Sequence, residues 1–193
     1  LLDAFGSPAD VFTASRDAVA AICGFQVADA IAAPPPASTL QAVARTQEWL
    51  AKPGNHVLTL HDPAYPRMLR EIYDPPLLLY AIGRIELLSA VSVAIVGSRN
   101  ASTQGKANAQ SFAHAFSNAG LTIVSGLALG IDAAAHEGAL AGPGSTVAVI
   151  GTGADIVYPS RNYKLAHRIA EAGCIISEYS LGHPVLASNF PRR

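Results

Sequence analysis

The sequence is poor in cysteine and has no long hydrophobic run. Its two cysteines, Cys23 and Cys174, form no Cys-x-x-Cys pair, which excludes a disulfide-rich fold and predicts buried, reduced thiols. No apolar run reaches the ~20 residues that a membrane span needs, and no secretory signal is visible, so we predict a cytoplasmic protein without membrane contact. The six histidines are scattered, so no metal site is expected.

The sequence also has little charge. Charged residues make up 14% of the chain and hydrophobic residues 50%, so the chain can bury a sizeable core. A net charge of −1 by itself argues against a nucleic-acid-binding protein. The distribution differs between the halves, however. Residues 1–80 contain five Lys/Arg against eight Asp/Glu, whereas residues 81–193 contain eight against six, so the second part is mildly basic.

Several catalytic and cofactor motifs are absent. The sequence has no Walker lysine, no G-x-S-x-G, no H-E-x-x-H and no paired carboxylates. "VGSRNAST" stands where a nicotinamide cofactor would require G-x-G-x-x-G, which weakens the interpretation as a dehydrogenase. Glu178 is a candidate base, although a structural hydrogen bond is the favoured role. We therefore expect no cofactor and no catalytic residue.

The first part of the chain is predicted to be a small helical domain with a linker, residues 1–50. Residues 1–33 have an alanine-rich helical pattern, "APPPAS" is a stiff linker, and a helix follows from Thr39 to Ala51. The sequence begins in apolar, helix-like residues, so we expect this domain to be truncated at its N-terminus. Residues 55–193 form the second predicted domain, which opens with two short strands, 56–60 and 76–82.

Strands and helices alternate after Val91. Buried strands are predicted at 91–98, 121–126, 145–153 and 174–180, with helices at 102–120, 131–141 and 162–173. This alternation at short spacing predicts an α/β fold with a parallel sheet and helices on both faces, that is, a doubly wound sheet.

The predicted ligand site lies where the parallel strands end, because open α/β sheets bind ligands beyond their carboxyl ends. Glycines, hydroxyls and basic side chains gather there: Gly97, Ser98, Arg99, Ser125, Gly126, Gly130, Thr152, Arg161, Lys164, Arg192 and Arg193. This composition predicts a phosphate cradle in which the turn "SGLALGID" presents backbone N–H groups to the anion.

Each of these features has a structural alternative. Gly126 and Gly130 could serve close helix–sheet packing, and Asp132 could cap a helix. Lys164 and Arg168 could form a solvated helix face, and Tyr158 could belong to the core. His136 and His167 are predicted to be ordinary surface residues of their helices.

Five segments resemble the DprA/Smf family of bacterial DNA-processing proteins, in family order and spacing. They are "VAIVGSRNAS", "IVSGLALGIDAAAH", "VAVIGTGADIVYPSRNYKL", "IISEYSLG" and "SNFPRR". The resemblance implies an extended Rossmann-like domain that binds single-stranded DNA. It also implies a homodimer that loads the recombinase RecA in natural transformation, without catalysis. The family continues past "FPRR", so we expect a C-terminally truncated domain.

The resemblance also assigns residues to the DNA site. Phosphate contacts are expected from Arg99, the turn Ser125–Gly126, Lys164 and Arg193, and base contacts from Asn189 and Phe190. For Phe190, stacking on a base and packing in the core both remain open. His183 and Val185 depart from the family pattern, which leaves the shape of their loop undetermined.

One alternative function remains, a nucleotide-processing Rossmann enzyme such as a nucleoside-monophosphate phosphoribohydrolase. Those enzymes carry G-G-x-G-T-x-x-E. The nearest segment here, "GTGADIVYP", lacks the glutamate at that spacing.

Overall fold

The computed structural model describes residues 1–193 and divides into two compact units, Leu1–Ala44 and Arg45–Arg193. The division falls within helix α5 (Ala37–Leu50), whose last turns belong to the second unit. There Trp49 packs edge-on against Tyr80, with ring centroids 5.7 Å apart. No helix combines the length and the apolar character that crossing a membrane requires.

The first unit contains four short helices, in the region where the sequence showed a helical pattern. They are α1 (Leu2–Phe5), α2 (Pro8–Thr13), α3 (Arg16–Cys23) and α4 (Phe25–Ala32). Ser7 and Ser15 cap α2 and α3 by accepting the N–H groups of Asp10 and Ala18. Helices α3 and α4 then bury a small core of Val19, Ala20 and Ala28.

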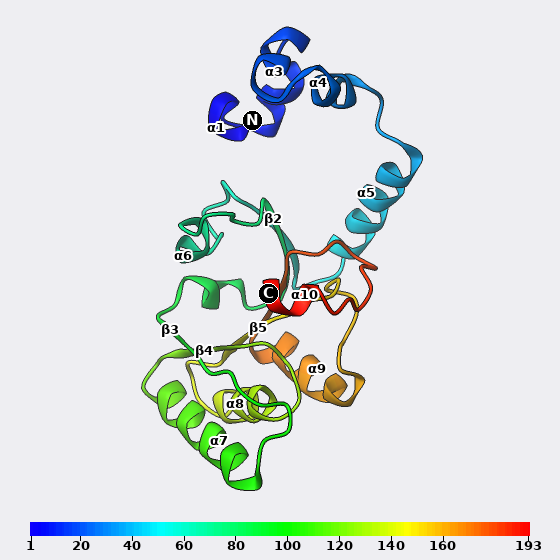
Figure 1. The fold of residues 1–193 in the computed structure, drawn as a ribbon. Coiled ribbons are helices and arrows are strands. Elements are labelled where there is room, and N and C mark those ends of the chain that lie inside the picture. The colour runs from blue at the N-terminus through cyan, green and yellow to red at the C-terminus, as the bar shows by residue number, and fades with distance from the viewer. The chain divides into compact units, whose positions relative to one another are not determined.

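The second unit is built on a six-stranded, mostly parallel sheet, which confirms the predicted fold class (Figure 1). The strands are β1 (Asn55–Thr59), β2 (Leu78–Gly83), β3 (Ser92–Ala94), β4 (Thr122–Ser125), β5 (Thr146–Val149) and β6 (Cys174–Ser177). Their order is β1-β2-β6-β5-β4-β3. Strands β3 to β6 are parallel, whereas β2 pairs antiparallel with β6, and β1 antiparallel with β2.

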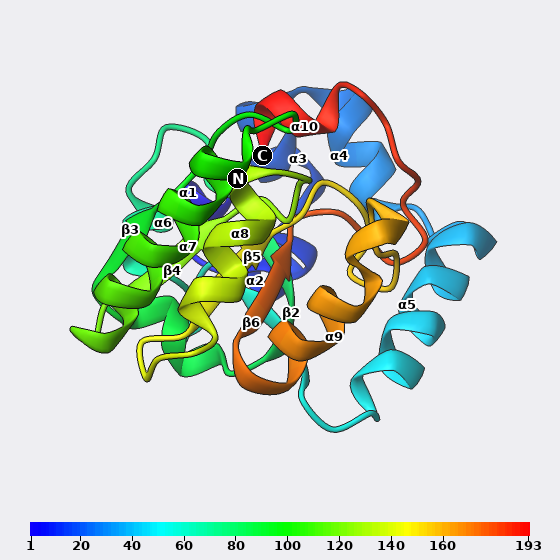
Figure 2. The ribbon, with the colours of Figure 1, turned by 90° about the horizontal axis from the view of Figure 1, so that it is seen from below.

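The crossover helices show that the sheet is not doubly wound. They are α7 (Thr103–Asn118), α8 (Ile131–Ala139) and α9 (Tyr163–Ala172). Strands β3 to β6 lie next to one another in the sheet in the same order as in the sequence, so every crossover leads to the next strand in the same direction. Right-handed crossovers of this kind place all three helices on one face of the sheet. Figure 2 views the molecule from this helix side. The opposite face carries only short helical segments, η1 (Ile85–Ser89) and α6 (Arg67–Arg70).

Alternate residues of the central strands divide the core between the two faces. Ala148 and Ile175 pack against Ile169 of α9, while Val147 and Ile176 pack against Leu87 of η1. Cys174 is also buried there, and burial raises the pKa of its thiol to about 12. Its thiol is therefore inert at neutral pH, as expected for a structural cysteine.

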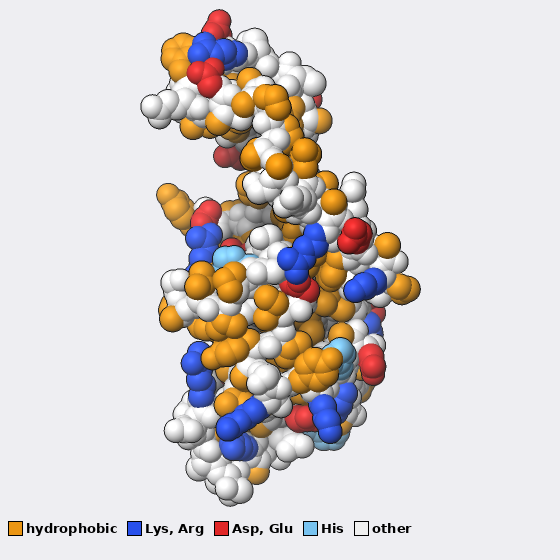
Figure 3. Space-filling view, turned by 90° about the vertical axis from the view of Figure 1, so that its right-hand side faces the viewer, with side chains coloured by type: hydrophobic (Ala, Val, Ile, Leu, Met, Phe, Trp, Pro, Cys, Tyr) orange, Lys and Arg blue, Asp and Glu red, His pale blue; other side chains and the backbone are white.

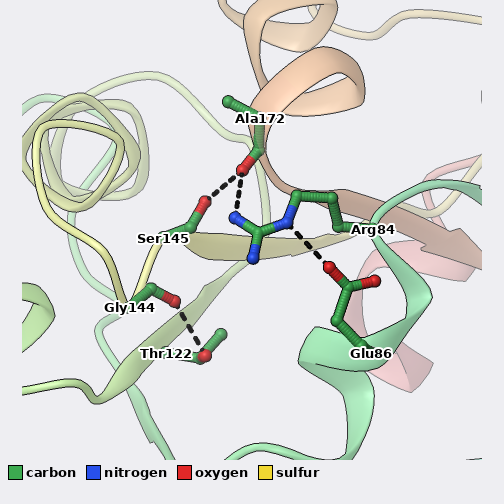
Figure 4. A network of polar contacts seen from close by, with 6 residues as sticks. All are labelled: Arg84, Glu86, Thr122, Gly144, Ser145 and Ala172. Atoms are coloured by element: carbon green, nitrogen blue, oxygen red, sulfur yellow. Dashed lines mark hydrogen bonds and ion pairs between the residues drawn. The ribbon is translucent and has the colours of Figure 1, made fainter.

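At the amino ends of β4, β5 and β6, polar groups of the protein form hydrogen bonds with one another (Figure 4). The Thr122 hydroxyl donates to the Gly144 carbonyl at 2.8 Å. The Ala172 carbonyl, at the end of α9, accepts from the Ser145 hydroxyl at 2.6 Å and from Arg84 Nη1 at 3.2 Å. Arg84 also pairs with Glu86 at 2.8 Å. The polar groups of this edge thus bind one another.

Candidate nucleic-acid interface

The loop after β3 is joined closely to the loop after β4. The Ile131 N–H donates to the Ser98 carbonyl at 3.2 Å, and the Ser98 hydroxyl accepts from the Asn100 N–H at 3.1 Å. A Cβ on Gly130 (φ +84°) would lie 2.2 Å from the Ser98 carbonyl oxygen, and a Cβ on Gly97 would lie 2.7 Å from Ile131 Cγ1. Both glycines therefore allow close packing of the two loops, which for Gly130 was the alternative to direct phosphate contact.

Three backbone N–H groups in the turn after β4 are bound by side chains of the same protein. The N–H groups of Gly126 and Ala128 donate to Asp132 Oδ2 at 3.2 and 3.3 Å. The Leu127 N–H donates to His136 Nε2 at 3.3 Å, and the Ser125 hydroxyl donates to the Ile95 carbonyl at 2.6 Å. The side chain of Asp132 takes the place that the sequence had assigned to a phosphate.

One of the two predicted surface histidines is buried. His167 is exposed on α9, but His136 has an exposed fraction of 0%. The prediction was wrong for His136 because α8 is covered on one side by α7 and on another by the sheet. The His136 ring supports the turn after β4 because its Nε2 accepts the N–H of Leu127.

The C-terminal segment returns to the same edge as helix α10 (Asn189–Arg192). Asn189 is buried, with 7% of its surface exposed, and its Nδ2 donates to the Gly151 carbonyl at 2.9 Å. The amide therefore fixes α10 to the loop after β5, and the expected base contact of Asn189 stays a prediction. Phe190 is half-buried and packs over Gly151, where a Cβ would meet its ring at 3.2 Å.

Two guanidinium groups converge on the ring of Phe190. Arg99 Cζ lies 5.4 Å and Arg193 Cζ 5.5 Å from the ring centroid, within the range of cation–π attraction. Arg193 Nη1 also donates to the Gly126 carbonyl at 2.5 Å. Burial lowers the pKa of Arg193, and the charge of Arg99 acts in the same direction, whereas Asp132 opposes both. Two like charges held together in a partly buried place form a favourable site for an anion.

These groups line one crevice at the carboxyl ends of β3, β4 and β5. It has a volume of about 430 Å³, and its lining includes Gly97, Arg99, Ser125, Gly126, Asp132, Phe190 and Arg193. Tyr158 borders the adjoining space, with 41% of its surface exposed and its ring centroid 5.5 Å from that of Phe190. The sequence indicated a possible core position for Tyr158 and did not assign it to the site. Its position directly before Pro159, beyond the third parallel strand, was the only available signal.

Arg161 and Lys164 lie outside this crevice. Arg161 belongs to η2 (Ser160–Asn162) and Lys164 to the first turn of α9, and both side chains are exposed without an ion pair. Figure 3 shows one face of the molecule, on which Lys and Arg side chains are dispersed among hydrophobic ones and several stand beside acidic ones. The basic residues predicted to share one site are thus divided between the crevice and the start of α9.

Glu178, the candidate base, faces a different cavity. This cavity, of about 440 Å³, lies beside α6 and the loop that follows it and is lined mainly by apolar side chains. Glu178 Oε1 lies 3.4 Å from Arg192 Nε, so the carboxylate is engaged in an ion pair. This arrangement agrees with the structural role favoured for Glu178.

Known proteins resemble most of this chain. The sequence profile of the family described as DNA recombination-mediator protein A matches residues 56–193. The DNA processing protein DprA of Streptococcus pneumoniae is 46% identical over 132 residues, covering 68% of this chain and 46% of that protein. Protein Smf of Synechocystis is 44% identical over 140 residues, covering 70% of this chain and 35% of that protein. The chain therefore spans less than half the length of these two relatives.

Solved structures agree with the sequence matches. The X-ray structure of DprA from Streptococcus pneumoniae superposes with a TM-score of 0.68 at 39% identity, covering 86% of this chain and 60% of that chain. A structure of DNA processing protein A from Helicobacter pylori, described as giving insights into its unique single-stranded DNA binding mode, has a TM-score of 0.63 at 33% identity. It covers 70% of this chain and 61% of that chain. Since the family profile covers residues 56–193, which include the crevice, this chain belongs to the DprA/Smf family of DNA recombination mediators.

Proposed function

We propose that this chain binds single-stranded DNA in the crevice at the carboxyl ends of β3, β4 and β5, as the DNA-binding part of a recombination mediator. The observation that carries the proposal is the convergence of Arg99 and Arg193 on the ring of Phe190. Guanidinium groups bind phosphate oxygens, and an aromatic ring offers a stacking surface to bases of any sequence. Together they match a nucleic acid backbone with unstacked bases.

Support for DNA as the ligand comes from the family. The Helicobacter pylori relative is described by its single-stranded DNA binding mode, and the family is described as recombination mediators. We extend the proposal to the family's wider role: cytoplasmic action, loading of RecA onto the bound strand, and dimerisation of the full-length protein. The crevice is proposed to act without a cofactor or catalysis. Contacts from Arg161 and Lys164 would be made by a strand that leaves the crevice toward α9.

The proposal is tested by titrating the protein with fluorescent oligo(dT) and with thymidine 5′-monophosphate at two salt concentrations. We expect the oligonucleotide to bind with an affinity that falls as salt rises, because phosphate contacts release counterions. The mononucleotide should bind far more weakly and remain intact. Release of thymine from the mononucleotide, or equal affinity for both ligands, would instead favour the nucleotide-processing enzyme.

Replacing Phe190 by alanine separates its two possible roles. We expect oligo(dT) affinity to fall by roughly ten- to a hundredfold, since stacking contributes about 1–3 kcal/mol per base. The melting temperature should change little, because the ring is only half-buried. Phe112→Ala removes a comparable ring from α7, where it is 59% exposed, and serves as the matched control. Unchanged affinity with a loss of ~3–5 kcal/mol in stability would show that Phe190 is a core residue.

A further inference from the structure

Asp132 places a carboxylate inside the proposed DNA crevice. Its Oδ2 accepts the N–H groups of both Gly126 and Ala128, which holds the carboxylate in a fixed position at the start of α8. The residue is 4% exposed, yet it lines the crevice together with Arg99 and Arg193. A Cβ built on Gly126 would lie 2.9 Å from Asp132 Oδ2 and 2.5 Å from Arg193 Nη2, so both groups converge above this glycine.

The charged side chains that line the crevice therefore sum to a single positive charge. Arg99 and Arg193 contribute two positive charges, and Asp132 removes one. An internal phosphodiester of DNA carries one negative charge and balances this set. A phosphomonoester has a second pKa near 6 and carries almost two negative charges at pH 8. Its additional charge would be unbalanced and would lie close to the Asp132 carboxylate.

We propose that Asp132 makes the crevice selective for singly charged phosphodiesters over doubly charged phosphomonoesters. The inference rests on the proposed DNA-binding function, and it defines which phosphate groups the site accepts. Free nucleotides and 5′-phosphorylated ends are disfavoured, whereas internal backbone phosphates are accepted. At a separation of a few ångström in a partly hydrated site, one additional charge changes affinity by roughly tenfold or more.

The test compares two small ligands that differ in one methyl group. Thymidine 5′-monophosphate is a dianion at pH 8, and its phosphate methyl ester is a monoanion. Each is titrated calorimetrically at constant ionic strength into the wild type and into Asp132→Asn. The asparagine oxygen can still accept both N–H groups of the turn, so this variant removes the charge and keeps the hydrogen bonds.

In the wild type we expect the methyl ester to bind roughly tenfold more tightly than the monophosphate. In Asp132→Asn this preference should disappear or reverse. A wild type that binds the monophosphate as well as the ester overturns the inference, and so does a folded variant that keeps the wild-type ratio. If the variant does not fold, the wild-type ratio alone decides.

Failure of the proposed function would give a different result. Oligo(dT) that does not bind, or that binds equally well to Arg99→Gln, would contradict DNA binding in this crevice. The ratio of the two small ligands is measured without DNA, so it tests the selectivity of Asp132 independently.

Discussion

A double variant, Arg99→Gln with Arg193→Gln, should bind oligo(dT) at least a hundredfold more weakly than the wild type at low salt. Both guanidinium groups line the same crevice and face the same ring. A hydrogen bond to a charged group contributes about 1.5–3 kcal/mol, so each lost contact costs roughly a factor of ten or more. In addition, the slope of log K against log [salt] should be smaller by about 1.4, since each single-strand phosphate contact contributes about 0.7.

The matched control for this double variant is Arg84→Gln. Arg84 lies at the opposite edge of the sheet, where it binds Glu86 and the Ala172 carbonyl (Figure 4). The control removes one positive charge away from the crevice, and its affinity should stay within about twofold of the wild type. If the double variant keeps both the affinity and the salt slope of the wild type, the DNA site is elsewhere. Arg161 and Lys164 on η2 and α9 would then be the next residues to replace.

The sequence predicted the elements of the sheet well because each parallel strand is a short apolar run followed by a helix. The order of the strands was less accessible. Strands and helices alternate along the chain in the same way whether successive crossovers all advance in one direction or reverse direction within the sheet. Only the strand pairing distinguishes these two arrangements, and here β3 pairs with β4, β4 with β5 and β5 with β6. The doubly wound sheet was therefore an assumption about pairing, which apolar periodicity does not determine.

In the site, too, the sequence predicted that several residues come together but not which groups bind one another. Arg99, Gly126 and Arg193 meet because the carboxyl ends of parallel strands share an edge and α10 returns to it. Composition does not show whether backbone donors bind a ligand or a side chain of the same protein, and in the structure the N–H groups of Gly126 and Ala128 bind Asp132. Asp132 is only four residues beyond Ala128, so its carboxylate can reach the Ala128 N–H. Because Asp132 is buried, its carboxylate requires donors from within the protein.

Lowering the pH from 7 toward 4 should destabilise the protein through His136. The ring is fully buried, and its two nitrogens have defined partners. Since the Thr146 hydroxyl donates to the Ile123 carbonyl at 2.6 Å, His136 Nδ1 donates to Thr146 Oγ1 at 2.7 Å. His136 Nε2 accepts the Leu127 N–H at 3.3 Å. The ring is therefore neutral, and burial lowers its pKa to about 3. Protonation would remove the acceptor that supports the turn after β4.

The direction of the effect follows from the two pKa values. An unfolded chain protonates its histidines near pH 6.5, while folded His136 stays neutral down to about pH 3. Between these values the unfolded state binds one more proton, so stability falls as the pH falls, and above pH 6.5 this histidine contributes no pH dependence. At pH 5 the loss is ~2 kcal/mol, from about 1.4 kcal/mol per pKa unit.

Urea unfolding of the wild type and His136→Asn at pH 7.5, 6 and 5 measures this contribution. The variant should lose ~2–4 kcal/mol at pH 7.5, because it leaves a cavity and the Leu127 N–H without its acceptor. Its stability should then decrease less between pH 7.5 and 5, so that the difference between the two proteins narrows by ~2 kcal/mol. Parallel pH profiles would show that His136 is protonated as readily in the folded chain as in the unfolded one. Such a result would contradict a neutral, buried ring beneath the turn that carries Gly126 and Asp132.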